Sequence, residues 1–395
     1  MGDIKFIFWT KPHPNHTNCR AARKKAPGPD RAVILSGDES IVTLFDSPAF
    51  DGHESITAFR DEDSGLSCIF AFHSTLRGPG AGGCRMLPYA DTDAALRDAL
   101  LLSRAMSFKS AIADLALGGA WSVIIGDSRT GKSPNLFEAY GRAVETFSGR
   151  FWAIVDVGTT ASDLRLARTQ SRYITGLDGH PAAAGDPSPI TAESVFRSVT
   201  LGVKRLHGSS LSGVRIAIQG VGQVGASLAE KFNKAGARLI IADADNDVAR
   251  AVADRTGAAI VPPEAIIAQD VDVFCPCALG GTISNQALEH LQARIVAGGA
   301  NNQLATPELG KRLFERGILY APDYVANAGG IVGIAGEIGA SQRGEPFDVD
   351  WVSGKLDRLM QTLDDIFERS AAEHRPTDQI ADDIAKERLI SKAAV

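Results

Sequence analysis

The stretch R-I-A-I-Q-G-V-G-Q-V-G, Arg215–Gly225, decides the fold of this 395-residue chain. Gly220, Gly222 and Gly225 form a G-x-G-x-x-G pattern that follows a strand-like run and opens a helical one. Glycines at this spacing permit a tight turn and let a pyrophosphate approach the N-terminus of a helix. A second strand-like run, L-I-I-A, ends at Asp243, 23 residues beyond Gly220. The stretch therefore predicts a Rossmann-type dinucleotide-binding unit.

The acidic residue after the second strand indicates the cofactor. Asp243 would accept hydrogen bonds from the adenosine ribose hydroxyls, and its charge would repel a 2′-phosphate. The unit is therefore expected to bind NAD rather than NADP, with Gln223 and Val224 completing the glycine turn. The alternative is a glycine turn in an α/β unit that binds nothing, and the full strand–turn–helix–strand context disfavours it.

The composition is that of an ordinary soluble globular protein, with 44% hydrophobic and 22% charged residues. A net charge of −6 argues against binding to nucleic acid or a membrane surface, because either usually requires a basic footprint. No apolar run approaches the ~20 residues that span a bilayer, and the N-terminus lacks the order of a signal peptide. We therefore expect a cytoplasmic protein without a metal site, whose scattered cysteines are free thiols: Cys19, Cys68, Cys84, Cys275 and Cys277.

Alternating strand-like and helical segments predict an α/β fold. Residues 1–40 are rich in basic residues and proline and are expected to be a disordered extension. Residues 41–185 are predicted to form a first α/β domain and residues 186–330 the Rossmann-type domain. Residues 331–395 are predicted to be mainly helical and amphipathic.

Individual elements follow from the same patterns. In residues 56–60 and 66–73, apolar and polar residues alternate on the two sides of D-E-D-S-G, and this pattern predicts a β-hairpin. The segment G-P-G-A-G-G-C-R at 78–85 predicts a loop, or backbone that approaches another group closely. The remaining expectations are helices at 92–108, 136–147 and 192–206, and strands at 122–125, 152–155, 214–219, 238–242, 271–274, 294–297 and 318–320.

A second nucleotide motif competes with the first. G-D-S-R-T-G-K-S, Gly126–Ser133, satisfies G-x-x-x-x-G-K-[ST] between a strand and a helix. The apolar run that ends at Asp156 could supply a magnesium-binding carboxylate, as in phosphoryl-transfer enzymes. Pro134 crowds the start of the following helix and argues against a P-loop.

The stretch Arg104–Asp127 contains one lysine, Lys109, in an apolar helical run, followed by Gly118 and Gly119. A lone lysine of this kind is usually a side chain whose amine reaches solvent from the edge of a core. A Gly-Gly pair before a strand is usually a turn. A functional interpretation of this stretch therefore needs support from the rest of the chain.

Taken together, the motifs resemble the Glu/Leu/Phe/Val amino-acid dehydrogenase family, and within it the leucine and phenylalanine dehydrogenase branch. The resemblance covers residues 41–395, and in this family the loop that matches a P-loop is a surface connection. The matching motifs are G-P-G-A-G-G-C-R-M at 78–86, R-A-M-S-F-K at 104–109, L-A-L-G-G-A-W-S-V-I-I-G-D at 115–127, D-V-G-T-T at 156–160, D-P-S-P-I-T-A at 186–192, C-P-C-A-L-G-G at 275–281, A-G-G-A-N-N-Q-L at 297–304 and Y-A-P-D-Y-V-A-N-A-G-G at 320–330.

The resemblance implies a substrate-binding and catalytic first domain, an NAD-binding second domain, a cleft between them, and C-terminal helices that return toward the first domain. It also implies a homo-oligomer that reversibly deaminates a small-molecule substrate, an L-amino acid, to a 2-oxo acid. Lys109 matches the lysine that pairs with the substrate carboxylate, and Asp156 matches the aspartate that orients the amine and shuttles protons. Gly82 and Gly83 match glycines that line the substrate site, with Met86 near the pocket.

Further site residues are implied around the cofactor. Asn302, with Asn301 beside it, and Asn327 match polar groups near the nicotinamide and the substrate. Thr191 matches a contact to the nicotinamide amide. Val332 lies where the family shapes the pocket for the substrate side chain.

One departure from the family pattern concerns the chemistry. The family has L-G-G-G-K where this chain has L-G-G-A-W, so that Trp121 occupies the position of the catalytic lysine. In the family that lysine activates the attacking water and stabilises charge on the intermediate. An indole has one N–H donor and no basic site near neutrality, so it cannot replace an amine.

Three hypotheses follow from this departure. The chain could be an NAD-dependent L-amino-acid dehydrogenase with altered chemistry, acting on an apolar or aromatic amino acid. It could instead be an oxidoreductase that reduces a preformed imine and needs no water activation. The third hypothesis is a catalytically inactive paralogue that binds NAD. The P-loop phosphoryl-transfer enzyme remains a minor fourth.

Overall fold

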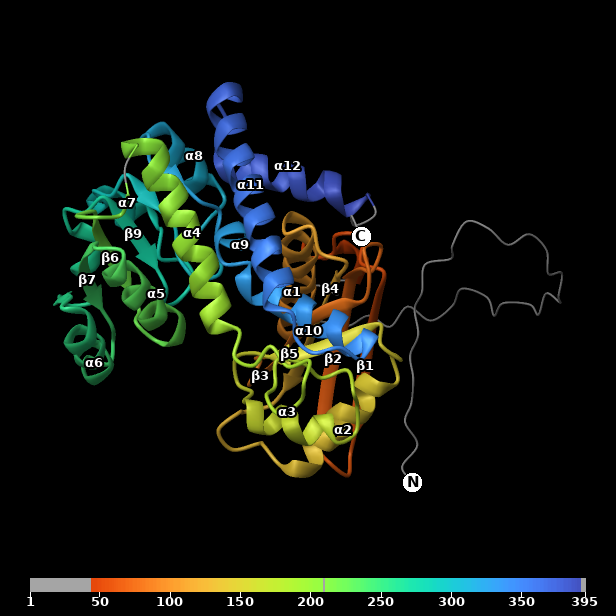
Figure 1. The fold of residues 1–395 in the computed structure, drawn as a ribbon. Coiled ribbons are helices and arrows are strands. Elements are labelled where there is room, and N and C mark those ends of the chain that lie inside the picture. Colours follow the sequence, from red (N-terminus) through yellow and green to blue (C-terminus); the bar gives the residue numbers. More distant parts are fainter. Residues whose placement is uncertain (1–43, 209, 392–395) are drawn as a thin grey trace, which may run out of the picture.

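The computed structural model describes residues 44–208 and 210–391, which form two lobes that are each built on one β-sheet (Figure 1). The first sheet has the strand order β1-β2-β4-β3-β5. Its strands are β1 (Ser55–Asp61), β2 (Leu66–Ser74), β3 (Gly80–Leu87), β4 (Gly118–Ile125) and β5 (Phe151–Val155). The antiparallel β1–β2 pair confirms the predicted hairpin, and β3, β4 and β5 run parallel to one another.

The second sheet is parallel throughout and has the order β11-β10-β9-β6-β7-β8. Strand β6, which comes from the stretch Arg215–Gly225, lies in the middle of this sheet. The strand order reverses at β6, and dinucleotides bind at such a reversal in this fold. The strands are β6 (Arg215–Gln219), β7 (Arg238–Ala242), β8 (Ala259–Ile260), β9 (Val273–Pro276), β10 (Ile295–Val296) and β11 (Leu319–Tyr320). The predicted Rossmann-type α/β fold is confirmed.

Helices cover both sheets and connect them. The first lobe contains α1 (Thr92–Ile112), α2 (Pro134–Glu145) and α3 (Ala161–Arg168), and the second contains α5 (Gln223–Lys234), α6 (Asn246–Thr256), α7 (Asn285–His290) and α8 (Glu308–Glu315). The others are α4 (Ser188–His207), α9 (Asp323–Ala326), α10 (Gly329–Arg343), α11 (Val349–Glu373) and α12 (Thr377–Leu389), with short 3-10 turns at Leu44–Asp46 and Ile266–Ala268.

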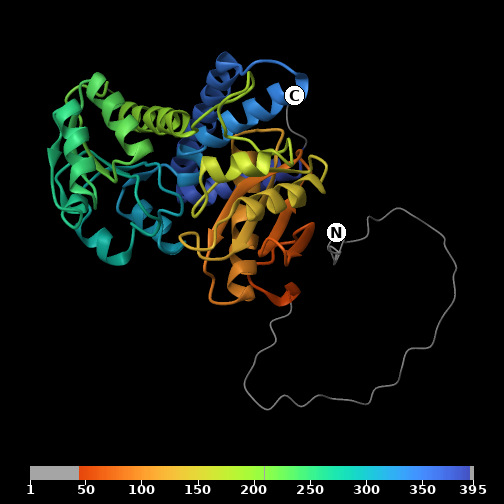
Figure 2. The same cartoon turned by 90° about the horizontal axis from the view of Figure 1, so that it is seen from below.

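The C-terminal helices return to the first lobe, as predicted. The Arg77 guanidinium in the first lobe donates to the carbonyl oxygen of Arg388 at 2.7 Å, and Arg388 donates to the carbonyl of Ile112 at 2.6 Å. Lys355 on α11 donates to the carbonyl of Asp114 at 2.9 Å. Figure 2 shows the blue C-terminal helices where the two lobes meet. These cations thus donate to carbonyl groups at the end of α12 and at and just after the end of α1, where the helix itself leaves carbonyl groups without partners.

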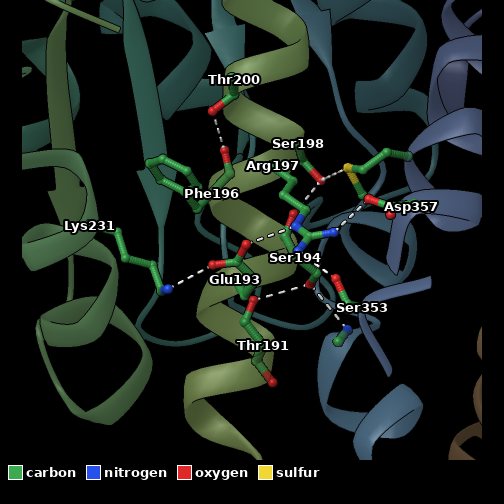
Figure 3. Close-up of polar contacts among 12 residues, drawn as sticks. Thr191, Glu193, Ser194, Phe196, Arg197, Ser198, Thr200, Lys231, Ser353 and Asp357 are labelled. Carbon is green, nitrogen blue, oxygen red and sulfur yellow. Dashed lines mark hydrogen bonds and ion pairs between the residues drawn. The ribbon is translucent and has the colours of Figure 1, made fainter. Parts of the chain in front are cut away.

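The helix α4 links the Rossmann-type lobe to α11 through a chain of ion pairs (Figure 3). Glu193 accepts from Lys231 on α5 at 2.6 Å and from Arg197 at 2.7 Å, and Arg197 also donates to Asp357 on α11 at 2.8 Å. Ser194 donates to the carbonyl of Ala326 at 2.6 Å. Contacts on several sides of α4 therefore fix the start of this helix relative to the α9–α10 junction.

The glycine-rich segment 78–85 differs from the prediction of a loop, because most of it forms β3 between β4 and β5. A Cβ atom at Gly82 would lie 1.7 Å from the carbonyl oxygen of Ala120, so the close approach is to the backbone of β4. Gly119 is likewise part of β4 rather than a turn, and a Cβ there would lie 2.1 Å from the amide nitrogen of Ser107 on α1.

The domain boundaries stay predictions. The boundary between residues 185 and 186 lies just before α4, and the boundary at 331 falls within α10. Residues 1–40, predicted to be a disordered extension, lie outside the described residues.

Candidate active site

Trp121, Gly83 and Asp156 lie together on the face of the first sheet that α1 covers. Gly83 pairs with Ile154 on β5, and Asp156 follows directly after that strand. A Cβ atom at Gly83 would lie 2.4 Å from Cζ2 of Trp121 and 2.7 Å from Cβ of Asp156. The indole therefore crosses β3 at Gly83 and ends beside Asp156, which is possible only because position 83 carries no side chain.

Arg85 holds Asp156 in an ion pair. Its Nε donates to Oδ2 of Asp156 at 2.7 Å, and its Nη1 donates to both carboxylate oxygens of Asp98, at 3.2 and 3.0 Å. Tyr89 donates its hydroxyl to Asp98 at 2.5 Å, and the Arg85 guanidinium lies 5.7 Å from the Trp121 ring centroid. The site thus contains one cation between two carboxylates.

Sequence reasoning did not assign Arg85 a role. The alternation of a strand could have found it, because residues two apart on β3 point to the same face, and Arg85 follows Gly83 by two. A charged residue in an otherwise buried strand is itself a sign of a specific partner.

Trp121 brings a donor and no base. The side chain is 9% exposed, and its Nε1 is buried without a hydrogen-bond partner among the described residues. The backbone beside it is tightly held, since the Asp156 amide donates to the hydroxyl of Thr159 at 3.1 Å, which in turn donates to the carbonyl of Cys84 at 2.8 Å. The buried indole therefore forms one wall of the site, against Gly83.

Lys109 bridges the two lobes. Its amine, near the end of α1, donates to Oδ1 of Asn301 at 2.9 Å, and Asn327 donates to the same oxygen at 3.0 Å. Burial lowers the pKa of Lys109 to about 8, and the charge of Asp323 opposes that shift. The structure therefore brings the predicted residues Lys109, Asn301 and Asn327 together at the joint between the first sheet and the Rossmann-type lobe.

Asp323 is a second residue that sequence reasoning missed, although it lies in the quoted motif Y-A-P-D. Its carboxylate accepts from the amides of Gln303 at 2.9 Å and Tyr324 at 2.6 Å. Burial raises the pKa of Asp323, and these amides and the Lys109 amine act in the opposite direction. An acidic residue in the first turn of the short helix α9 is the only local signal for it.

The other predicted residues are not all in this cluster. Met86 is fully buried on the opposite face of β3, where a Cβ at Gly126 would lie 3.1 Å from its Cε, so it is a core residue. Val332 is fully buried in α10. Asn302 is exposed with φ +52°, and its carbonyl accepts from Gly281 at 2.7 Å.

Thr191 lies in the first turn of α4, against the A-N-A-G-G segment. Its hydroxyl donates to the carbonyl of Pro187 at 3.0 Å, and a Cβ at Gly330 would lie 2.8 Å from it. The structure therefore places Thr191 on the same side of the joint as the loop that carries Asn327.

The glycine turn after β6 leaves room for a pyrophosphate. Gly220 has φ +88°, and a Cβ at Gly225 would lie 2.0 Å from the Gly220 carbonyl oxygen. A Cβ at Gly222 would meet no atom within 4 Å, and Gly222 begins α5 without a side-chain cap. Open space at a helix N-terminus with free N–H groups suits an anion. Gln223 and Val224 form the first turn of α5, so the residues present fit a dinucleotide.

Asp243 lies at the end of β7 beside this turn. Its Oδ2 accepts from the amide of Val221 at 2.8 Å, and its Oδ1 accepts from the amide of Asp245 at 3.0 Å. The carboxylate is therefore held beside the glycine turn by two backbone amides.

The P-loop alternative receives no geometric support. Lys132 forms an ion pair with Asp163 at 2.6 Å, and the Ser133 hydroxyl caps α2 by accepting from the amide of Leu136. Both side chains that a P-loop would direct to a nucleotide are thus engaged within the first lobe. In the described ranges, no three His, Cys, Asp or Glu residues are placed to hold a metal ion, and no helix combines the length and apolarity needed to cross a bilayer.

The structure thus combines a Rossmann-type lobe that has an open glycine turn with a second α/β lobe whose Lys109 reaches it, an arrangement expected of nicotinamide-dependent oxidoreductases. Comparison with known protein families supports this class of protein. The model described as Glu/Leu/Phe/Val dehydrogenase, dimerisation domain, matches residues 53–176, and that of glutamate/leucine/phenylalanine/valine dehydrogenase matches residues 241–388. The chain is 38% identical to the leucine dehydrogenase of Bacillus subtilis over 338 residues, which is 85% of this chain and 91% of that protein. The chain belongs to the Glu/Leu/Phe/Val dehydrogenase family.

Other relatives and structures extend the comparison. The valine dehydrogenase of Streptomyces virginiae is 40% identical over 351 residues, which is 88% of this chain and 96% of that protein. The crystal structure of L-tryptophan dehydrogenase from Nostoc punctiforme has a TM-score of 0.74 at 35% identity and covers 86% of this chain and 96% of its own. The protein is thus an oxidoreductase of the amino-acid dehydrogenase type.

Proposed function

We propose that this chain oxidises the amino-bearing carbon of an apolar or aromatic L-amino acid, with reversible hydride transfer to NAD. The observation that carries this proposal is the position of Lys109, whose amine contacts Asn301 at the joint of the two lobes. A half-buried ammonium group at that place can pair with a substrate carboxylate beside the dinucleotide fold. Relatives that act on leucine, valine and tryptophan support an apolar or aromatic substrate.

The remaining roles follow from geometry and chemistry. Asp156, held by Arg85, would exchange a proton with the substrate nitrogen. The Trp121 indole would form one wall of the substrate site across Gly83. NAD, when bound, supplies the hydride acceptor. The turn at Gly220–Gly225 would hold its pyrophosphate, and Thr191 and Asn327 would contact the nicotinamide end.

NAD is proposed over NADP because Asp243 presents a carboxylate at the ribose position. Replacing it by serine is expected to lower kcat/KM with NAD and to raise it with NADP, each by about tenfold, because the repulsion of the 2′-phosphate disappears. Equal kcat/KM values with the two cofactors in the unmodified protein would contradict the proposal.

We also propose a cytoplasmic homo-oligomer assembled through the first lobe. The matched model for residues 53–176 is described as a dimerisation domain, which supports the assembly. The described cysteines are free thiols, which supports a reducing compartment. The substrate is a small molecule, and the net charge of −6 does not favour nucleic acid or a membrane surface as a partner.

The test is NADH formation by the full chain with a panel of L-amino acids that includes secondary ones. Lys109→Ala is expected to raise KM at least tenfold, and Asp156→Asn to lower kcat by about 10²-fold or more. Lys311→Ala, on α8 with a side chain that is 67% exposed, is the matched control and is expected to leave both values unchanged. Tight NAD binding without turnover of any substrate would instead identify an inactive paralogue.

A further inference from the structure

A cavity of about 610 Å³ lies between the first lobe and the end of α10, and it is separate from the candidate active site. Its lining includes Trp152 and Tyr173 from the first lobe, residues 180–182, and residues 341, 342, 344 and 345 at the end of α10. Asp156 follows β5 four residues after Trp152, so the two lie about 13 Å apart along the strand. Neither Asp156 nor Lys109 lines the cavity.

The wall formed by residues 180–182 is held in place from α10. These residues belong to the segment that leads from the first lobe into α4. The carboxylate of Glu337 on α10 is buried and accepts from the amides of Gly176 at 3.1 Å and Ala184 at 3.0 Å, on either side of them. Nε2 of His180 lies 3.4 Å from the same carboxylate. The cavity is therefore bounded by a fixed segment.

The charges that line this cavity are not balanced. The Arg168 guanidinium donates to a backbone carbonyl, and the Arg172 guanidinium donates to the hydroxyl of Tyr173 at 3.0 Å. Neither guanidinium forms an ion pair within residues 44–208 and 210–391. The lining carboxylate, Glu345, is held by Arg343 at 2.5 Å. An anion in the cavity would give both guanidinium groups an oppositely charged partner.

The apolar part of the lining is aromatic and carries a further donor. The ring centroids of Trp152 and Tyr173 lie 5.3 Å apart, and the Arg172 guanidinium lies 5.1 Å from the Tyr173 centroid. Trp152 is 4% exposed, and its Nε1 is buried without a hydrogen-bond partner among the described residues. A buried donor without a partner costs free energy, so an acceptor atom placed beside it is stabilised.

We propose that this cavity binds a small organic carboxylate with an aromatic or apolar body. The carboxylate accepts from the guanidinium groups of Arg168 and Arg172 and from Nε1 of Trp152, because guanidinium groups pair well with carboxylates. The body of the ligand lies against the rings of Trp152 and Tyr173. The bound molecule also contacts residues 180–182, which precede α4. This binding site is distinct from the site of the proposed reaction and uses none of its residues.

Calorimetric titration of the full chain with 3-phenylpropanoate tests the proposal. This probe has a carboxylate and a ring but lacks the amino group that an amino-acid dehydrogenase oxidises. We expect a Kd of about 1 mM or lower. The uncharged 3-phenylpropanamide and inorganic phosphate should each bind at least about tenfold more weakly, because the first lacks the charge and the second lacks the ring.

Variants assign the bound probe to this cavity. The probe could also pair with Lys109, so the titration is repeated with Lys109→Ala, in which one site per chain should remain. Arg172→Gln and Trp152→Phe each remove one donor, and each should weaken binding at least about fivefold. Arg129→Gln is the matched control, because its side chain is 85% exposed and does not line the cavity, and it should bind normally. Thermal unfolding checks that each variant folds, and the exposed Arg172 decides the matter if Trp152→Phe does not fold.

Several outcomes would overturn the proposal. Binding that disappears in Lys109→Ala would assign the probe to the active site. Unchanged affinity in a folded Arg172→Gln or Trp152→Phe, or equal affinity for phosphate, would show that the cavity does not recognise the probe as described. Absence of binding to the unmodified chain would do the same, also where a second copy of the chain covers the cavity. None of these measurements depends on turnover, so they leave the proposed function to its own test.

Discussion

The Nε atom of Arg85 lies 2.7 Å from Oδ2 of Asp156, and the same guanidinium contacts both oxygens of Asp98. The carboxylate beside the Trp121 indole is thus an oriented, ion-paired group on the first sheet. The side chains of this pair are 20% and 19% exposed, so the partner left behind by a substitution would be poorly solvated.

Replacing Arg85 should therefore impair catalysis more than substrate binding. We expect Arg85→Gln to lower kcat by about 10- to 100-fold with a small change in KM, because Asp156 loses the donor that orients it. Arg85→Lys should recover part of the loss. Steady-state kinetics measures both values, with Arg129→Gln as the matched control, because the side chain of Arg129 is 85% exposed. An unchanged kcat in Arg85→Gln would show that the ion pair does not position Asp156.

The burial of Lys109 predicts a pH limit on substrate binding. Its pKa is lowered to about 8, so the ammonium form needed for a carboxylate is present below that pH and is lost above it. We expect KM to rise about tenfold per pH unit above pH 8, and Asp323→Asn to move this rise to lower pH, because the Asp323 charge favours the ammonium. Lys109→Gln should have a high KM without this rise. Initial rates across pH 7 to 10 test this, and a KM that is flat in the unmodified protein would refute it.

Two glycines of the dinucleotide turn should respond differently to alanine. Gly225→Ala places a Cβ 2.0 Å from the Gly220 carbonyl oxygen and should destabilise the lobe, whereas Gly222→Ala meets no atom within 4 Å and should fold normally. Because that open space suits the pyrophosphate, Gly222→Ala should weaken NAD binding at least about tenfold without lowering Tm. Calorimetric titration and thermal unfolding measure the two effects. Normal NAD affinity in Gly222→Ala would place the pyrophosphate elsewhere.

A buried histidine pair predicts a loss of stability in mild acid. The rings of His53 and His73 lie 5.0 Å apart, and burial lowers the pKa of His73 to about 4 from 6.5. As pH falls below 6.5, the unfolded chain takes up the proton and the folded chain does not. The stabilisation is therefore complete above pH 6.5 and is lost as pH falls toward 4. The difference amounts to roughly 3 kcal/mol.

Urea unfolding at a series of pH values between 7 and 4.5 measures this loss. We expect His73→Gln to reduce the slope of the unfolding free energy against pH. The control is His374→Asn. His374 is the exposed C-cap of α11 and has a positive φ, which asparagine tolerates, so this substitution should leave the slope unchanged. Identical slopes in His73→Gln and the unmodified protein would assign the pH dependence to other groups.

The sequence by itself determined those features that depend on neighbours along the chain. The glycine spacing at Gly220–Gly225 and the apolar runs around it predicted the Rossmann-type lobe. The alternation of apolar and polar residues on the two sides of residues 61–65 predicted the first hairpin. Local patterns failed where a strand lacks large side chains or is very short. Residues 80–87 form a central strand despite their glycines, because β4 approaches closely, and the two-residue strand β8 carries almost no pattern.

Only the tertiary structure decided which charged groups meet. Lys109 and Asn301 are 192 residues apart, and their contact exists because α1 of one lobe reaches the loop after β10 of the other. Arg85 and Asp156 are 71 residues apart and meet because neighbouring parallel strands carry them. Periodicity fixes the face of a helix or strand on which a side chain lies, whereas its partner depends on strand order and on how the lobes pack. The sequence therefore located Trp121 as the departure from the family, and the fold placed its indole against the ion-paired Asp156.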